Sequence, residues 1–322
     1  MSNRYYLAAD GGGSKLQAVL YDENFDVIRT GTMSGTNVMF KPVEETKAEI
    51  DRLLDSLLDG VSALTSVDVC LVGSEGYFQE SLQRRCRVEG LHTYSEPCMG
   101  LAAAFCDSGA LALSGTGSDA FLIKDGKVLV YVGGWGPLFG DEGSGYDIGL
   151  SSIKAAIYAY DCRRPPTVLT DMIIEKFGLN SLWDIVSRMN RNPNARYEIA
   201  SVAKLTAKAA EQGDSVAILI YRHAAHEMAL QAITAIRRAY ADWNGKLVLM
   251  GGAWKGSSVM AKAFESEVKQ VYPETKMLLP VYEPVIGCVI LRALREGMRM
   301  EEIRTHLQGK FDMYLYKIGG IS

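Results

Sequence analysis

The sequence lacks both a long apolar run and a concentration of basic residues. No stretch approaches the roughly 20 uncharged apolar residues that a membrane-spanning helix needs. The formal net charge is −4 and the Lys and Arg residues are scattered, which is unlike the positively charged face of a nucleic-acid-binding protein. Near the N-terminus, a charged residue and a glycine run come too early for the apolar core of a signal peptide. We therefore expect a cytoplasmic protein that binds neither membranes nor nucleic acids.

Cysteine pairs and histidine clusters are also scarce. The six cysteines include no Cys-x-x-Cys pair, which is typical of reduced thiols in a cytosolic protein rather than of a disulfide framework or a zinc site. His223 and His226 lie three residues apart in a predicted helix, where two histidines could share a metal ion. Because no further ligand lies nearby in the sequence, we favour a packing or solvated face over a metal site.

The length and the pattern of apolar residues indicate two domains. A chain of 322 residues exceeds the about 250–300 residues at which single hydrophobic cores stop growing. The first hundred residues alternate short apolar runs, tight turns and segments of helical period, and they predict the order βββαβαβα. The expected elements are strands at 5–9, 16–21, 25–30, 67–72 and 91–94 and helices at 42–58, 78–88 and 99–105.

The same pattern begins again near residue 110. The glycine-rich hairpin at Gly13 and Ser14 is matched by a second one at Gly117 and Ser118, and each hairpin opens a similar run of elements. We interpret this as a duplicated unit that forms two lobes, residues 1–109 and residues 110–322. After its hairpins the second lobe is predicted to be mostly helical, with helices at 142–160, 168–177, 182–188, 200–211, 215–243, 257–271 and 284–296 and a strand at 246–250.

Three glycine turns follow predicted strands, where the backbone could approach a ligand closely. In the first, Asp10–Lys15, three glycines let N–H groups converge on an anion, while Ser14 adds a hydroxyl donor and Lys15 adds charge. Asp10 ends a strand and is placed to hold a metal ion through water. The segment is not a Walker A loop, and by itself it could also be an ordinary hairpin turn.

The other two glycine turns strengthen the case for a nucleotide. Ser114–Ser118 contains three hydroxyls that can alternate with backbone donors around a phosphate. Leu247–Lys255 is a buried strand that leads into Gly251 and Gly252, where the backbone can approach a flat adenine or ribose. One such loop could be structural, but three at strand ends favour nucleotide binding.

The segment Gly133–Tyr146 is the densest in glycine. Trp135 offers a flat face for the apolar side of a sugar. Asp141 precedes a predicted helix, and a carboxylate near a helix N-terminus is stabilised as the anion, so it could accept sugar hydroxyls or orient metal-bound water. The alternative is that Asp141 only caps the helix; we favour the functional role.

In these four segments the chain resembles the sugar kinase/Hsp70/actin superfamily, and within it the N-acetylglucosamine kinase family and the related benzoyl-CoA-reductase-associated ATPases. Asp10–Lys15 resembles the phosphate-1 loop, Ser114–Ser118 the phosphate-2 loop and Leu247–Trp254 the adenosine loop, while Gly133–Tyr146 is the most specific match. The resemblance implies an α/β, two-lobe actin-like ATPase (ribonuclease H-like) fold from a duplicated βββαβαβα unit, with an ATP cleft between the lobes.

The resemblance also implies roles for individual residues. The ATP-binding residues would be Gly11, Gly12, Gly13, Ser14, Lys15, Gly115, Thr116, Gly117, Ala210, Gly251 and Gly252. The sugar would be bound by Asn37, Gly134, Trp135, Gly136 and Asp141. To these we add Glu75, from a loop that departs from the family pattern. Asp10 would hold Mg²⁺ through water, and relatives suggest a homodimer.

Two departures from the family pattern fall on the acceptor side. The catalytic aspartate of the family is replaced by Glu96, which keeps the carboxylate on a side chain one methylene longer. The loop Val72–Gly76 carries an additional acid, Glu75, where the family usually has small residues. Glu96 is therefore the first candidate for the base that takes the acceptor proton, and Glu75 is the second.

We expect an ATP-dependent kinase that phosphorylates a hydroxyl of an amino sugar (N-acetylglucosamine, glucosamine or N-acetylmuramic acid), with Glu96 and Asp10 as its catalytic residues. The alternative is an ATPase that activates a partner enzyme and has no sugar kinase activity. Those relatives that carry an iron–sulfur cluster need closely placed cysteines, which this sequence does not obviously supply. A nucleotide-sensing structural protein of the actin kind is disfavoured by the Trp135 loop.

Overall fold

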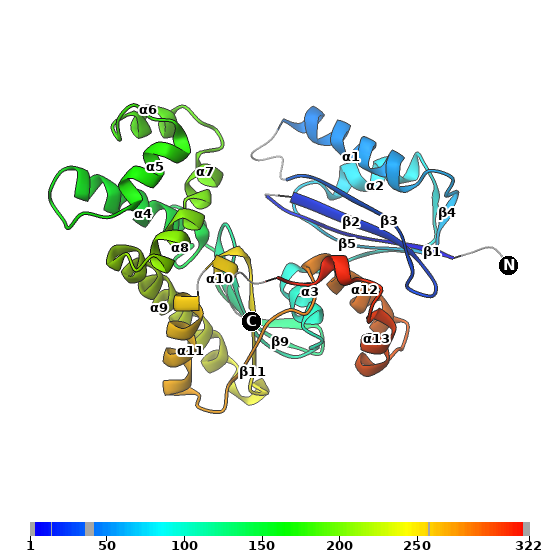
Figure 1. The fold of residues 1–322 in the computed structure, drawn as a ribbon. Coiled ribbons are helices and arrows are strands. Elements are labelled where there is room, and N and C mark those ends of the chain that lie inside the picture. The colour runs from blue at the N-terminus through cyan, green and yellow to red at the C-terminus, as the bar shows by residue number, and fades with distance from the viewer. Residues whose placement is uncertain (1–3, 14, 36–41, 257, 318–322) are drawn as a thin grey trace. The chain divides into compact units, whose positions relative to one another are not determined.

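The computed structural model describes residues 4–13, 15–35, 42–256 and 258–317 (Figure 1). The chain divides into two compact units. Unit 1 comprises Met1–Asp107 and Pro280–Tyr316, and unit 2 comprises Ser108–Leu279 and the last six residues, Lys317–Ser322. The predicted division at residue 109 is thus close to the first boundary, but residues 280–316 pack in unit 1 and not in the second lobe.

Unit 1 is built on a mixed sheet in the order β3-β2-β1-β5-β7. Its strands are β1 (Tyr5–Gly11), β2 (Lys15–Asp22), β3 (Val27–Ser34), β5 (Ser66–Leu71) and β7 (Leu91–Thr93), with β4 (Ala63–Leu64) and β6 (Arg87–Val88) forming a small separate pair. The first three strands are antiparallel, whereas β5 is parallel to β1 and to β7. The register places Asp10 beside Cys70.

Helices cover both faces of this sheet because side chains alternate between the two faces of a strand. The helices of unit 1 are α1 (Val43–Leu57), α2 (Glu75–Gln83), α3 (Glu96–Ala103), α12 (Pro284–Arg295) and α13 (Met300–Leu307). Leu7 and Ala9 of β1 belong to the core that contains α1 and α2, while Tyr6 and Ala8 belong to the core that contains α3, α12 and α13.

The return of residues 280–316 to unit 1 has a clear physical cause. On α12, Arg292 is buried with its guanidinium 4.0 Å from the ring centre of Tyr6 and 4.9 Å from that of Phe25. One turn later, Arg295 donates a hydrogen bond of 2.6 Å to the fully buried Asp68 of β5. The apolar and ionic partners of α12 therefore lie in the first hundred residues.

Unit 2 repeats the same topology in a second sheet. The order is β10-β9-β8-β11-β12, which matches unit 1 strand for strand. The strands are β8 (Gly109–Ser114), β9 (Ser118–Lys124), β10 (Lys127–Gly133), β11 (Lys246–Met250) and β12 (Lys276–Leu278). Again the first three strands are antiparallel, whereas β11 is parallel to β8 and to β12. Both sheets are therefore consistent with the predicted duplication of the βββαβαβα unit.

Most of the helices of the chain lie in unit 2. They are α4 (Gly145–Tyr160), α5 (Leu169–Phe177), α6 (Asp184–Asn190), α7 (Ala195–Ser201), α8 (Ala203–Glu211), α9 (Ser215–Arg238), α10 (Gly252–Gly256) and α11 (Ser258–Val271). The long helix α9 ends at Arg238 and not near residue 243, because Ala239 leaves helical geometry at φ −136° and a short 3₁₀ turn follows. The sequence analysis did not anticipate α7, α13 or β12.

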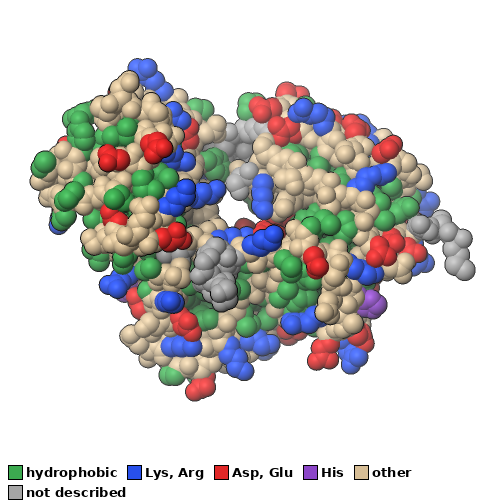
Figure 2. All heavy atoms as spheres, in the orientation of Figure 1, with side chains coloured by type: hydrophobic (Ala, Val, Ile, Leu, Met, Phe, Trp, Pro, Cys, Tyr) green, Lys and Arg blue, Asp and Glu red, His purple; other side chains and the backbone are tan. Residues whose placement is uncertain are grey.

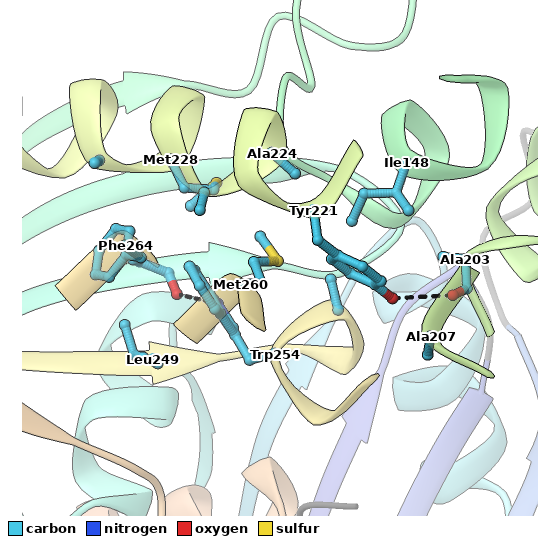
Figure 3. Close-up of a cluster of buried hydrophobic side chains, with 14 of the residues drawn as sticks. Ile148, Ala203, Ala207, Tyr221, Ala224, Met228, Leu249, Trp254, Met260 and Phe264 are labelled. Carbon is cyan, nitrogen blue, oxygen red and sulfur yellow. Dashed lines mark hydrogen bonds between the residues drawn. The ribbon is translucent and has the colours of Figure 1, made fainter. Parts of the chain in front are cut away.

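A buried cluster around Trp254 fixes the segment after β11 (Figure 3). The indole nitrogen of Trp254 donates to the carbonyl oxygen of Ala112 on β8 at 3.1 Å, and Phe264 of α11 packs edge-on against the indole. Nearby, the hydroxyl of Tyr221 on α9 donates to the carbonyl oxygen of Ala203 at 3.0 Å. These contacts hold the start of α10, and with it Gly252, against the end of β8.

The surface carries both signs of charge. Figure 2 shows Lys and Arg side chains interspersed with Asp and Glu on each unit. In the ranges that the structure describes, none of the helices is both long and apolar enough to cross a membrane.

Candidate functional site

The second glycine turn, Ser114–Ser118, joins β8 to β9 in unit 2. The hydroxyl of Ser114 donates to the carbonyl oxygen of Gly143, and that of Ser118 donates to the carbonyl oxygen of Glu142, both at 2.7 Å. We expected all three hydroxyls of this turn to face a phosphate. Two of them instead hold the turn to the following loop, which leaves the half-buried Thr116 at the tip.

Backbone hydrogen bonds join the same turn to the Gly133–Tyr146 loop. Gly134 donates to the carbonyl oxygen of Ser118 at 3.0 Å, and Gly145 donates to that of Gly115 at 2.8 Å. Tyr146 donates to the carbonyl oxygen of Thr116 at 3.3 Å. The segment predicted to bind a sugar and the turn predicted to bind phosphate are therefore one structure within unit 2.

The third glycine turn packs directly on the second. Gly251 follows β11, which is parallel to β8, and it has a φ of +119° that disfavours other residues. A side chain there would overlap the carbonyl oxygen of Ser114 and lie 2.9 Å from the nitrogen of Gly115. Ala210 is buried near the end of α8, a helix that contacts α10. The predicted nucleotide-binding residues of unit 2 thus come together.

Trp135 lies in the open part of the Gly133–Tyr146 loop. Its side chain is 75% exposed, and Leu138 and Phe139 beside it are exposed as well. By contrast Trp254 is 1% exposed in the core. Gly136, at φ +80°, lets the loop turn directly after the indole. An exposed tryptophan in a glycine-rich loop suits stacking on a ligand better than packing in a core.

Asp141 is almost fully covered, with 4% of its side chain exposed. One carboxylate oxygen accepts a hydrogen bond of 2.7 Å from Arg196 on α7, and the other faces the backbone nitrogen of Ser118 at 3.4 Å. The alternative of a helix cap is wrong, because Ser144 is the N-cap of α4 and accepts a bond from Asp147. Sequence reasoning missed Arg196, which lies 55 residues from its partner and belongs to no motif.

In unit 1, Asp10 lies at the end of β1. Burial raises the pKa of its carboxyl to about 6, with Lys15 opposing the shift and Glu283 adding to it. Lys15 begins β2, and its ammonium group lies 2.6 Å from Gln17 and 3.4 Å from Glu283. The cation predicted to meet a phosphate therefore lies beside a carboxylate of the segment that precedes α12.

The first two glycines of the first turn have different surroundings. A side chain on Gly11 would lie 2.9 Å from Leu71 and 3.0 Å from Leu16, whereas one on Gly12 would have none of the described residues within 4 Å. The backbone nitrogen of Gly12 donates to the carbonyl oxygen of Lys15 at 3.1 Å, so the turn is closed. Gly13 is exposed. Ser14 and Asn37 lie outside the described residues.

Three acids of unit 1 affect the titration of Cys70. Glu96 begins α3 and is followed by Pro97, while Glu75 begins α2. Burial raises the pKa of the Cys70 thiol, and the charges of Asp10, Glu96 and Glu75 raise it further. Both alternative bases and the predicted metal-binding acid thus act electrostatically on one side chain, and Asp10 lies beside it in the sheet.

Glu96 has the properties of a group that exchanges protons near neutral pH. The residue is exposed, and the protein atoms around its carboxyl group weaken the solvation of the charged form. This desolvation, together with the negative charge of Asp10, raises the pKa of Glu96 to about 7. A carboxyl with such a pKa suits general acid–base chemistry.

The two histidines of α9 have a simpler environment. His226 lies 2.7 Å from Glu267 of α11, and His223 is exposed. Within the described ranges, no group of three or more His, Cys, Asp or Glu residues could hold a metal ion.

Comparison with known proteins agrees with the resemblance inferred from the glycine turns. The chain is similar to the N-acetylmuramic acid/N-acetylglucosamine kinase of Clostridium acetobutylicum, with 28% identity over 305 residues, 89% of this chain and 98% of that protein. It is also similar to the N-acetyl-D-glucosamine kinase of Dictyostelium discoideum, with 25% identity over 318 residues, 90% of this chain and 98% of that protein.

The fold is shared with solved sugar kinases. A candidate N-acetylglucosamine kinase from Porphyromonas gingivalis superposes with a TM-score of 0.72 at 17% identity, over 91% of this chain and 100% of that one. A ROK family glucokinase from Streptomyces griseus gives a TM-score of 0.56 at 12% identity, over 91% and 100% of the two chains. The expected α/β actin-like fold, with a five-stranded sheet in each of two units, is confirmed.

A family match covers most of the sequence and confirms the predicted relationship. Residues 9–291 match the model of an ATPase family that is named after its members BadF, BadG, BcrA and BcrD. The chain therefore belongs to the BadF/BadG/BcrA/BcrD ATPase family.

Proposed function

We propose that the protein is an ATP-dependent kinase that phosphorylates a hydroxyl of an amino sugar. The substrate class is N-acetylglucosamine or a relative such as glucosamine or N-acetylmuramic acid. Membership of an ATPase family supports the use of ATP. Relatives named as kinases of these sugars, matched over 98% of their length, support the acceptor.

One observation carries this proposal. The exposed Trp135 loop is joined to the Ser114–Ser118 turn by the 3.0 Å hydrogen bond from Gly134 to Ser118. A sugar stacked on Trp135 and a phosphate bound at the turn would then lie close together, as group transfer requires. An ATPase without a sugar substrate would have no use for this exposed aromatic side chain beside the phosphate.

The nucleotide would be bound mainly by the glycine turns. We assign the phosphates to Gly115, Thr116 and Gly117 and the adenosine to Gly251, Gly252 and Ala210, because Gly251 packs on the phosphate turn. From unit 1, the residues assigned to ATP are Gly11, Gly12, Gly13, Ser14 and Lys15.

The sugar would be recognised by Gly134, Trp135, Gly136 and Asp141, with Asn37 and Glu75 on the acceptor side. Asp141 is covered and bound to Arg196, so a sugar hydroxyl would share its carboxylate with the guanidinium. Phosphoryl transfer depends mainly on positioning the reactants and on stabilising the charge of the phosphoryl group. Trp135 and Asp141 of this loop would position the sugar, and the guanidinium bound to Asp141 would supply positive charge.

Glu96 would orient the acceptor hydroxyl and take its proton, and Glu75 is the second candidate for this role. A pKa of about 7 for Glu96 lies close to a working pH near neutrality, where proton transfer to a general base is most effective.

The residues present fit a magnesium ion held through water. Mg²⁺ is usually bound by one or two carboxylates, substrate phosphates and waters rather than by an all-protein cage. Burial and the negative charge of Glu283 raise the pKa of Asp10, and the positive charge of Lys15 only partly opposes them. When Asp10 is ionised, a bound cation would therefore offset its negative charge. Bound there, Mg²⁺ would neutralise charge on the phosphate oxygens of ATP.

The activity is tested by incubating the protein with Mg-ATP and a panel of amino sugars. We expect ADP release that depends on the sugar, together with a sugar phosphate detected by mass spectrometry. ADP release stimulated only by a partner protein would support the alternative, an activating ATPase. That alternative is disfavoured because five of the six cysteines are buried and only Cys162 is exposed, which does not suit a cluster at a subunit interface.

Within the sugar loop, Asp141→Asn should weaken sugar binding by about 10- to 100-fold, since a lost charged hydrogen bond costs about 1.5–3 kcal/mol. Nucleotide binding should change less, because an asparagine amide oxygen can still accept from Arg196. Calorimetry with each ligand measures both effects. Equal losses for sugar and nucleotide would contradict the assigned role.

The cellular setting completes the proposal. We infer a cytoplasmic location from the six cysteines, which form no disulfide in the described part of the chain, and a homodimer from the family resemblance. Light scattering of the purified protein would give the mass directly, and a value near that of one 35.2 kDa chain would contradict the dimer.

A further inference from the structure

Arg196 lies at the phosphate turn of unit 2, although nothing in its local sequence marks it. Its guanidinium nitrogen Nη2 is 2.7 Å from the carboxylate of Asp141. The same nitrogen would lie 3.2 Å from a side chain built on Gly117. The guanidinium therefore borders the middle of the glycine turn itself.

The position of Arg196 is built into the fold. Helix α7 carries it and packs along α4, and the two backbones meet at Gly149, where any side chain would overlap the carbonyl oxygen of Ile199. One turn earlier on α4, a side chain on Gly145 would lie 3.0 Å from the carbonyl oxygen of Gly115. Because Gly145 and Gly149 carry no side chains, the phosphate turn and α7 can both pack closely against the first turns of α4.

The ion pair is unequally exposed. The side chain of Asp141 is 4% exposed and that of Arg196 is 25% exposed. The anion is covered while part of the cation still reaches the surface beside the turn. A guanidinium has five N–H donors, so it can bond to Asp141 and to a second anion at the same time.

We propose that Arg196 binds an oxygen of the terminal phosphate of ATP at the Gly115–Gly117 turn, and that Asp141 holds it in place for this task. The inference rests on the proposed kinase function and adds a residue to it. Arg196 would balance the charge that develops on the transferred phosphoryl group. Because Asp141 is also assigned to the sugar, the pair would connect recognition of the acceptor to the phosphate that it receives.

The test compares two nucleotides that differ by the terminal phosphate. Binding of Mg²⁺ with a non-hydrolysable ATP analogue, and separately with ADP, is measured by calorimetry for the parent chain and for Arg196→Met. We expect affinity for the analogue to fall about 10- to 100-fold, as for a lost charged hydrogen bond, and affinity for ADP to fall less than about threefold. Arg196→Lys should retain part of the difference, because it keeps the charge without the planar fork.

Arg188→Met is the matched control. Arg188 lies on α6 and donates two hydrogen bonds of 2.8 and 2.9 Å to Glu198, which is on α7 like Arg196. Removing the Arg188 guanidinium therefore disturbs α7 without touching the glycine turn. It should leave both nucleotide affinities unchanged. Thermal melting of each variant monitors folding.

Removing Arg196 also leaves the buried Asp141 unpaired, which can destabilise the chain. If Arg196→Met fails to fold, the double variant Asp141→Asn with Arg196→Met removes that charge and is measured against Asp141→Asn alone. Equal losses for the analogue and ADP, or no loss for either, would overturn the assignment of Arg196. Failure of the parent chain to bind the analogue or to phosphorylate any amino sugar would instead overturn the proposed function.

Discussion

Gly11 and Gly12 are neighbours in the first glycine turn, yet they should respond differently to substitution. None of the described residues lies within 4 Å of a side chain at Gly12, and its φ lies outside the left-handed region. Gly12→Val should therefore fold normally while placing a side chain where a phosphate is proposed. We expect ATP affinity in calorimetry to fall by at least about tenfold, or 1.4 kcal/mol, with little change in melting temperature.

Gly11→Ala provides the contrast. Its new methyl group would lie 2.9 Å from Leu71, and overpacking of this kind costs about 1–3 kcal/mol. We expect a lower free energy of unfolding in urea. If the Gly12→Val variant binds ATP with unchanged affinity, the assignment of this turn to the nucleotide is wrong.

Glu96 should control the rate of the chemical step. Glu96→Gln keeps the size of the side chain but cannot accept a proton, and general bases contribute about 10²–10⁴-fold. In the parent chain, kcat/KM should rise as pH passes through about 7, where Glu96 loses its proton. Steady-state kinetics with the best sugar, from pH 5 to pH 9, measure both effects.

Glu75→Gln is the companion variant for the same experiment. Near-normal kcat in Glu96→Gln would show that Glu96 is not the base, and a loss in Glu75→Gln alone would move the role to the other acid. Glu96 is the first residue of α3, where the helix fixes its backbone, so the longer side chain must be accommodated by the pocket rather than by movement of the main chain.

At the scale of elements, a buried polar network adds to the apolar packing that attaches α12 to the sheet of unit 1. Asp68 is fully buried and accepts from Ser66 at 2.7 Å, Tyr94 at 2.9 Å and Arg295 at 2.6 Å. Removing one partner of a buried ion pair costs about 3–5 kcal/mol. Asp68→Ala should therefore lower the free energy of unfolding by about 3 kcal/mol in urea denaturation.

The control is an exposed ion pair in the same unit. Glu80 on α2 and Arg84 just after this helix are 65% and 52% exposed. Such pairs contribute about 0–1 kcal/mol, so Glu80→Ala should change stability little. Equal effects of the two substitutions would show that the Asp68 network does not fix α12.

For the whole molecule, the raised pKa of Asp10 makes stability depend on pH. Its pKa of about 6 in the folded chain lies above the ordinary value of 3.8. The resulting stabilisation is present below pH 3.8 and is lost as pH rises through 6. Asp10→Asn cannot ionise, so relative to the parent it should gain on the order of 1–3 kcal/mol between pH 4 and pH 8.

Urea denaturation in magnesium-free buffer at several pH values measures this difference. Asp59→Asn, which removes a carboxylate from the exposed surface of unit 1, is the control for loss of a surface charge. Parallel stability curves for Asp10→Asn and the parent chain would contradict the prediction.

The order of the elements could be predicted because its signals are local. Alternation of apolar residues and glycine turns marked the hairpins at Gly13 and Gly117, and helical spacing marked the buried face of α1 at Ile50, Leu54 and Leu57. The order of strands in each sheet then follows from tight hairpins and from helical crossovers between parallel strands. Short elements such as β12 and α7 were missed because three to seven residues carry too little periodicity.

The sequence by itself determined the family, the duplicated unit and the glycine turns, since each depends on neighbouring residues. Only the tertiary structure decided which distant residues meet. The hydroxyls of Ser114 and Ser118 bond to the following loop, Arg196 joins Asp141 across 55 residues, and Arg295 joins Asp68 across 227. These partners are chosen by the packing of helices on sheets, which leaves no periodic trace in the sequence between them.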